Sequence, residues 1–308
     1  MMTSSLRWWM ATALFLVIVA ALGCSGELEA DDEEPTQEED VGVEDADTAG
    51  DAEDGDVASD AESDAESDTG DADDDYEVPE GMELVEGGTF RRGCDPDLDD
   101  DCRDQEMPAH EVTLSAFVID RFPVTEREYE DCVEDEVCDG PIHDSFYDGH
   151  GDDYPVVNIP SEQAITYCEW AEKRLPTEAE WEKAARGTDE RIYPWGDDEP
   201  DCSLANFDDC GGDMEPVGHA PDGVSPWGVE EMVGNVRHWT ADWFDGDYYE
   251  DSPDEDPQGP DSGTTRSVRG GSFFWGEDAL RASARNSMEG GADSYSDEVG
   301  FRCAKTVE

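Results

Sequence analysis

The cysteines are the residues of this sequence with the clearest chemical potential. Of the nine, Cys24 directly follows an apolar segment, and the rest lie between Cys94 and Cys303 without Cys-x-x-Cys spacing. In an exported chain, eight cysteines without that spacing indicate disulfides rather than zinc ligands. Short separations favour three pairs and leave a fourth, so the expected disulfides are Cys94–Cys102, Cys132–Cys138, Cys202–Cys210 and Cys168–Cys303.

Histidines and carboxylates offer weaker candidates for metal binding. The five histidines include no pair at the spacing of a helical metal site. His143 and His150 lie in an acidic loop, which is either a divalent-ion site or simply a solvated loop; its carboxylates are Asp144, Asp148, Asp152 and Asp153. A second stretch has EF-hand-like offsets at Asp95, Asp97, Asp99 and Glu106. Asp100 stands where an EF-hand requires glycine, so we do not expect an EF-hand.

Three helices are expected to position these groups. Two Thr-x-x-Glu capping boxes, at Thr125 and Thr177, predict helices that end near Val133 and at Gly187. Between them, Ser161 begins a helix with apolar residues at helical spacing, namely Ala164, Ile165, Cys168 and Ala171.

Two strands are expected before the helices, at 81–90 and 112–120. After Gly187 the sequence is dense in Trp, Gly, Pro and Asp, which predicts loops and short strands. The pattern indicates an α/β (α+β) domain with little regular secondary structure. No phosphate-binding glycine loop, dinucleotide fingerprint, nucleophile elbow or His-Glu-x-x-His motif is present.

The N-terminus has the features of an export signal. Arg7 precedes an apolar run of 15 residues, Trp8–Leu22, which is short for a membrane-spanning helix. The run ends in Ala21-Leu22-Gly23-Cys24, which resembles a bacterial lipobox with alanine at the usual leucine position. We therefore expect lipidation of Cys24 and attachment to the cell envelope, with the outer membrane or cell surface favoured by Ser25. An ordinary signal peptide with a coincidental cysteine is the alternative.

The formal net charge of −67 divides into two parts. Residues 25–77 contain 26 of the 85 acidic residues and no Lys or Arg, which predicts a disordered acidic tether. Weak binding of calcium or of a cationic partner is the alternative role for this segment. From residue 78 onward, 59 acidic residues face 17 basic ones, a net charge of −42. Such a charge excludes nucleic acid and anionic lipid surfaces as partners held by bulk electrostatics.

Five short sequence motifs occur in succession between residues 173 and 304. They are Lys173-Arg174-Leu175-Pro176-Thr177-Glu178-Ala179-Glu180-Trp181-Glu182, Tyr193-Pro194-Trp195-Gly196, Met232-Val233-Gly234-Asn235-Val236, Arg269-Gly270-Gly271-Ser272 and Gly300-Phe301-Arg302-Cys303-Ala304. Together they resemble the formylglycine-generating enzyme (sulfatase-modifying factor) family over about residues 80–306. The resemblance implies a disulfide-bonded, C-type-lectin-like fold and a family disulfide at Cys168–Cys303. The expected segments are a lipoprotein signal peptide (1–24), the tether (25–77) and this domain (78–308).

The resemblance also implies an oxidase that converts a sulfatase cysteine to formylglycine, using oxygen and copper(I) held by two cysteines. Soft thiolates suit copper(I). Here, however, Trp275 occupies the first copper-cysteine position, and no cysteine lies between Cys210 and Cys303. We therefore expect no copper, and a degenerate site around Ser272, Trp275, Leu280 and Arg285.

Two functions remain open from the sequence. The first is a non-catalytic module that binds a protein, peptide or glycan, with Trp275 filling the former copper position. The alternative is an oxidoreductase of the formylglycine-generating type that uses a divergent site. The missing cysteine pair favours the first.

The resemblance further implies two structural calcium sites, because hard oxygen donors suit calcium. The first maps onto Asn206, the carbonyl of Phe207 and Asp208, with Asp209 or Asp213 as further donors. The second maps onto Glu231, Gly234 and Val236. At the second site His238 replaces a carboxylate ligand, which weakens the expectation there.

Overall fold

The computed structural model describes residues 76–140, 151–291 and 294–307. All described residues belong to one compact unit, which lies within residues 70–308. The predicted signal segment, Cys24, nearly all of the tether and the loop with His143 and His150 lie outside the described residues. Within them, no helix has the length and apolarity needed to cross a membrane.

The three predicted helices are confirmed. The helices are α1 (Glu126–Glu134), α2 (Ser161–Trp170), α3 (Glu178–Arg186) and the short α4 (Tyr248–Asp251), with 3-10 turns at Asp104–Glu106, Asp208–Cys210, Pro221–Gly223 and Glu277–Ala279. Both capping boxes form: the hydroxyls of Thr125 and Thr177 accept from backbone N–H groups three residues later. Gly187 ends α3 with a φ of 71°, a conformation that favours glycine. Local capping chemistry therefore sets the ends of these helices.

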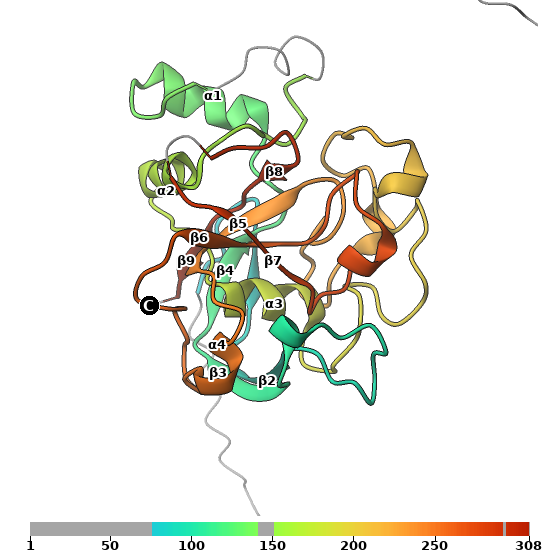
Figure 1. The fold of residues 1–308 in the computed structure, drawn as a ribbon. Helices are drawn as coiled ribbons and strands as arrows, with labels where there is room; N and C mark the ends of the chain where they lie inside the picture. Colours follow the sequence, from blue (N-terminus) through green and yellow to red (C-terminus); the bar gives the residue numbers. More distant parts are fainter. Residues whose placement is uncertain (1–75, 141–150, 292–293, 308) are drawn as a thin grey trace, which may run out of the picture. The chain divides into compact units, whose positions relative to one another are not determined.

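In the described part of the chain, nine short strands form three sheets; Figure 1 shows their arrangement. The strands are β1 (Met82–Val85), β2 (Gly88–Arg92), β3 (His110–Leu114), β4 (Phe117–Asp120), β5 (Arg237–Trp243), β6 (Thr265–Arg269), β7 (Arg285–Glu289), β8 (Val299–Gly300) and β9 (Ala304–Thr306). The sheet orders are β1-β4-β9, β2-β3 and β7-β6-β5-β8; among these described strands, β5 and β8 pair in parallel and the other pairs are antiparallel. The low content of regular structure agrees with the predicted class.

The two predicted strands, 81–90 and 112–120, are each divided in two. The antiparallel pairing of β1 with β4 continues in the same register as the pairing of β2 with β3. Both segments are interrupted at facing positions, 86–87 in the first and 115–116 in the second. At the break, a Cβ on Gly87 would lie 3.0 Å from the backbone nitrogen of Ala116. The bend therefore depends on a contact between distant residues, which periodicity cannot reveal.

Helix α3 forms the centre of the domain. It packs against β2, β5 and β6 (Figure 1), and all of its residues are buried. Trp181 is fully buried in the core and its indole nitrogen donates to Nδ1 of His238 at 3.1 Å. Because α3 is surrounded on several sides, its acidic residues must find partners inside the protein.

Those partners are arginines, in a group that we call the Glu178 cluster. It consists of Glu178, Glu182, Arg92, Arg269 and Arg285. The Glu178 carboxylate receives hydrogen bonds of 2.9–3.0 Å from all three arginines, and Arg269 also reaches Glu182 at 2.9 Å. Burial acts to raise the pKa of Glu178, but the guanidinium charges outweigh it and hold the pKa well below its usual value. The cluster joins β2, α3, β6 and β7.

All four predicted disulfides are present. Cys168–Cys303 spans 135 residues and lies in a core cluster with Tyr129, Tyr167 and Phe301. A loop of that length corresponds to about 5 kcal/mol of stabilisation in the chain-entropy model. This disulfide therefore ties α2 firmly to the C-terminal segment.

Candidate functional site

The position expected for the degenerate site lies on the turn that follows β6. Gly270 and Gly271 both have positive φ, and a Cβ on Gly270 would lie 2.6 Å from the carbonyl oxygen of Met232. Only glycine avoids that clash, so the turn is set by the close approach of the two chains. The turn places Ser272 and Trp275 close together: the backbone N–H of Trp275 donates to the Ser272 carbonyl at 3.0 Å.

Four side chains meet there, and we call them the Trp275 cluster: Ser272, Trp275, Glu298 and Arg237. The indole nitrogen of Trp275 donates to Oε2 of Glu298 at 2.7 Å, and the Ser272 hydroxyl donates to the same oxygen at 3.0 Å. Glu298 directly precedes β8, whereas Ser272 follows β6. One carboxylate oxygen thus holds the tryptophan and the serine together.

Arg237, at the start of β5, completes the cluster. Its Nη2 lies 3.6 Å from Oε2 of Glu298, and its Cζ lies 5.0 Å from the centroid of the Trp275 ring. Burial lowers the pKa of Arg237, and the charges of Glu298 and Asp297 only partly oppose that effect. The guanidinium is therefore a buried cation stacked on an indole and weakly countered by carboxylates.

The chemistry of the Trp275 cluster favours binding over covalent catalysis. Ser272 is fully buried and its hydroxyl is engaged with Glu298. The indole of Trp275 is not a nucleophile. The cluster thus presents an aromatic face, one cation and one carboxylate, which are groups that recognise a ligand.

Two other predicted site residues, Leu280 and Arg285, lie deeper in the fold. Leu280 is fully buried in the main core cluster, and the Arg285 guanidinium belongs to the Glu178 cluster. Neither has a described contact with Ser272 or Trp275. Both are inaccessible to a ligand at the surface because they are fully buried.

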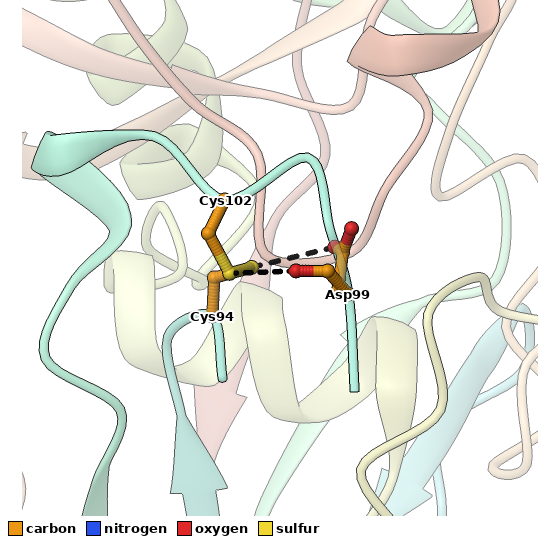
Figure 2. A group of neighbouring side chains, drawn as sticks. All are labelled: Cys94, Asp99 and Cys102. Atoms are coloured by element: carbon orange, nitrogen blue, oxygen red, sulfur yellow. Dashed lines mark hydrogen bonds between the residues drawn. A yellow bond between two sulfur atoms is a disulfide. The ribbon is translucent and has the colours of Figure 1, made fainter. Parts of the chain in front are cut away.

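The cysteines offer no thiolate in the described residues, because all eight are in disulfides. Figure 2 shows the one group of described side chains with metal-like spacing, formed by Cys94, Asp99 and Cys102. A carboxylate oxygen of Asp99 lies 3.3 Å from Sγ of Cys94. The two sulfurs form a disulfide, so they carry neither a proton nor a negative charge. The group is therefore not a metal site.

The acidic residues at EF-hand-like spacing in the same loop also make other contacts. Arg281 binds Glu106 through two hydrogen bonds of 2.8 and 3.0 Å and reaches Asp99 at 3.1 Å. Arg91 pairs with Asp95 at 2.7 Å. Asp95, Asp99 and Glu106 are therefore each paired with an arginine.

The residues of the first predicted calcium site share one turn. Asn206 is buried, and its amide donates to the carbonyl of Asp213 at 2.8 Å and to Oδ1 of Asn235 at 3.2 Å. Phe207 is buried next to it, and Asp208 is exposed. The turn offers hard oxygen donors, which fit calcium, and the site remains a prediction.

The residues of the second predicted calcium site have other partners. The Glu231 carboxylate accepts from the backbone N–H of Gly218 and, at 3.2 Å, from the Asn235 amide, and it lies 3.2 Å from Nδ1 of His219. Gly234 and Val236 are buried in the same segment.

Beside them lies a fixed cation. Arg302 donates to the carbonyl of Glu231 at 2.8 Å and to three other backbone carbonyls. Burial, with the charge of Arg302 as a further cause, lowers the pKa of His238 well below 6.5, so this histidine is neutral. The guanidinium on the Glu231 carbonyl brings a positive charge to this second set, and calcium binding there stays a prediction.

Sequence reasoning missed Arg237 and Glu298. Arg237 directly follows the Met232–Val236 motif, and Glu298 stands two residues before the Gly300–Ala304 motif. The available signal for these two site residues was a charged residue beside a family motif. Their meeting depends on the parallel pairing of β5 with β8, in which Arg237 lies opposite Val299.

A model of the "Sulfatase-modifying factor enzyme 1-like domain" matches residues 69–307. The chain belongs to this family. A formylglycine-generating enzyme of Thermomonospora curvata is 34% identical over 292 residues, which cover 74% of this chain and 94% of that protein. An "Inactive C-alpha-formylglycine-generating enzyme 2" of Bos taurus is 32% identical over 281 residues, covering 72% and 87% of the two chains. The sulfatase-modifying factor domain therefore has relatives named as enzymes and as inactive.

Longer proteins also contain a region similar to this sulfatase-modifying factor domain. A serine/threonine-protein kinase pkn1 of Chlamydia caviae is 36% identical over 251 residues, which cover 74% of this chain and 38% of the kinase. Among solved structures, PvdO from Pseudomonas aeruginosa matches with a TM-score of 0.62 and 24% identity, covering 73% of this chain and 94% of that one. That likeness shows the fold alone.

Proposed function

We propose that this protein is a non-catalytic member of the sulfatase-modifying factor family that binds a protein, peptide or glycan at the Trp275 cluster. The observation that carries the proposal is the state of the cysteines. All eight in the described domain form disulfides, and Trp275 stands where the family's first copper cysteine is expected. Copper(I) needs soft thiolates, so we expect no copper chemistry here.

The surroundings of Trp275 support this proposal. The indole is held by Glu298 and is partly exposed, and its neighbour Phe274 is 68% exposed. Exposed aromatic side chains next to an arginine are typical of recognition surfaces. The relative named as inactive in Bos taurus makes the loss of catalysis in this family a reasonable expectation.

An assay for oxidation tests the proposal directly. The full chain, loaded with copper(I), is incubated in air with a peptide that carries the family's Cys-x-Pro-x-Arg target, and aldehyde formation is followed by mass spectrometry. We expect no turnover above the peptide-only control. Oxygen-dependent aldehyde formation would overturn the non-catalytic assignment.

An oxidoreductase of the formylglycine-generating type with a divergent site is the second candidate. The 34% identity to the Thermomonospora curvata enzyme over 94% of its length favours it. It requires a redox group other than a thiolate pair at Trp275. The same assay, run also without added copper, decides between the two candidates, because a site that does not use copper would still form aldehyde.

Lipidation of Cys24 and anchoring to the cell envelope form the proposed location, supported by the lipobox-like sequence before Cys24. Labelling of cells with radioactive palmitate should mark the protein, and Cys24→Ser should abolish the label. Retention of label in that variant would contradict lipidation at this position.

Calcium at Asn206, Phe207 and Asp208 is proposed as a structural ligand. Calcium should raise the thermal midpoint of the full chain, because a ligand that binds only the native state stabilises it. Asp208→Asn should reduce the calcium increment, and magnesium serves as the control for nonspecific screening. Equal midpoints in calcium and magnesium would argue against a specific site.

A further inference from the structure

Arg237 differs from every other buried arginine in the described residues. Seven arginines are buried there, and six of them donate at least one side-chain hydrogen bond; these six are Arg92, Arg186, Arg269, Arg281, Arg285 and Arg302. The guanidinium of Arg237 makes none, and its approach to Glu298 is a loose 3.6 Å. Its Nε is buried and unpaired, as are the Nε atoms of Arg92, Arg186, Arg269 and Arg302, so the distinguishing feature is that none of the Arg237 donors has a partner. Its hydrogen-bond donors are therefore available to a ligand.

An unpaired buried donor is costly, at about 1–3 kcal/mol for each group left without a partner. Glu298 supplies counter-charge to Arg237 but no hydrogen bond, since its Oε2, which accepts from Trp275 and Ser272, lies 3.6 Å from Nη2 of Arg237. A ligand acceptor that reached the guanidinium would recover much of that cost. The cluster is thus arranged to receive an acceptor rather than to stabilise the fold.

A ligand can reach this place from solvent. The Arg237 side chain is 10% exposed, that of Glu298 is 21% exposed, and Trp275 is half-buried. Phe274, next in sequence to Trp275, projects into solvent. The guanidinium therefore keeps a small exposed fraction beside one partly exposed aromatic ring, that of Trp275.

Charge selects the ligand class. Arg237 is the only cation in the Trp275 cluster, and Glu298 and Asp297 both act on it electrostatically. A dianionic phosphate would meet repulsion from two carboxylates with a single cation to bind it. A planar, singly charged carboxylate matches the two-pronged geometry of one guanidinium.

We propose that Arg237 binds a carboxylate of a peptide ligand, with an apolar or aromatic neighbour of that carboxylate placed against Trp275 and Phe274. This inference rests on the proposed binding function and names the chemistry that the site recognises. The carboxylate comes from a chain end or from an acidic side chain, which share the same geometry at the guanidinium.

The test measures affinity of the full chain for three small probes by calorimetry. The probes are N-acetyl-Gly-Phe, with a free terminal carboxylate, N-acetyl-Phe-Asp-amide, with a side-chain carboxylate, and N-acetyl-Gly-Phe-amide, which has none. We expect at least one acid to bind tenfold or more tightly than the neutral amide. The stronger of the two acids identifies the source of the carboxylate.

Two variants of the Trp275 cluster should move affinity in opposite directions. Arg237→Gln should weaken acid binding tenfold or more, whereas Glu298→Gln should strengthen it several-fold because a competing carboxylate is removed. Arg127→Gln is the matched control, since Arg127 is 68% exposed and pairs with Asp152. A gain of affinity in Glu298→Gln cannot arise from misfolding, so the inference stays testable if Arg237→Gln does not fold.

Equal binding of acid and amide, or unchanged acid affinity in both cluster variants, would overturn the inference. Neither result would show turnover, so the non-catalytic assignment would stand. Conversely, aldehyde formation in the copper assay would remove the proposed function while leaving the affinity data intact. The two failures are therefore distinguishable.

Discussion

The Glu178 cluster and the Trp275 cluster use the same residue types in opposite ways. In the Glu178 cluster each arginine donates to a carboxylate at 3.0 Å or less, and the carboxylates are fully buried. In the Trp275 cluster the nearest carboxylate oxygen is 3.6 Å from Arg237, and the group is partly open to solvent. The first arrangement joins elements of the fold, and the second leaves donors for a ligand.

The difference teaches that burial of a charge is not by itself a sign of function. Glu178 is buried among three arginines and has a displaced pKa, yet its charge is fully engaged in joining β2, α3, β6 and β7. Arg237 is distinguished not by burial or by an unpaired Nε, which other buried arginines share, but by donating no side-chain hydrogen bond at all. Unsatisfied donors near the surface are the more informative feature.

The largest expected effect separates the two clusters by stability. Glu178→Gln should lower the free energy of unfolding by about 3–5 kcal/mol, because it leaves buried guanidinium charges without their counter-ion. Glu298→Gln should change it by less than about 1 kcal/mol, as expected for a partly exposed pair. Urea unfolding followed by fluorescence measures both, and similar losses in the two variants would contradict the comparison.

The pH dependence of the free energy of unfolding should report the ionisation of Asp242, whose carboxyl group lies beside the Glu178 cluster. Burial, with the charge of Glu178 as a further cause, raises the pKa of Asp242 to about 7. A raised native pKa means that this contribution to stability is complete below the unfolded value, near 3.8, and is lost as pH rises through about 7. The slope contributed by one such group is at most about 1.4 kcal/mol per pH unit.

The matched variant for that measurement is Asp242→Asn, which keeps an acceptor for the backbone N–H of Glu178, now 2.7 Å from Asp242. The wild type should lose stability relative to this variant between pH 4 and pH 7. Parallel pH profiles for the two proteins would show that Asp242 does not titrate in this window.

A smaller effect concerns the indole within the Trp275 cluster. Trp275→Phe removes the 2.7 Å hydrogen bond to Glu298 but keeps an aromatic ring and leaves the Ser272 bond in place. We expect a loss of about 0.5–1.5 kcal/mol in the free energy of unfolding. A loss as large as that of Glu178→Gln would assign the Trp275 cluster a structural role.

Salt should give the smallest difference between the clusters. The domain from residue 78 has a net charge of −42, so molar sodium chloride should raise the thermal midpoint of every variant by screening repulsion. The loss caused by Glu178→Gln should be the same in low and high salt, because buried pairs are little screened. A thermal midpoint that does not change with salt would contradict the expected role of surface repulsion.

Local signals in the sequence predicted the helices well. Thr125 and Thr177 cap helices through residues three positions away, so a short window contains the whole interaction. The strands were less predictable, since the break at Gly87 depends on its approach to Ala116. Within the degenerate site, Ser272 and Trp275 come together as neighbours in one turn, whereas Leu280 lies in the core.

By itself the sequence determined the family, the disulfide pairs, the helix ends and the absence of a cysteine at position 275, because each rests on residue type or on short spacing. Only the tertiary structure decided which of the buried arginines in the described residues donates no side-chain hydrogen bond. Arg285 meets Glu178 and Arg237 meets Glu298 across segments that are distant in the chain. The distance between such charges is set by the packing of strands and helices, and no local pattern records it.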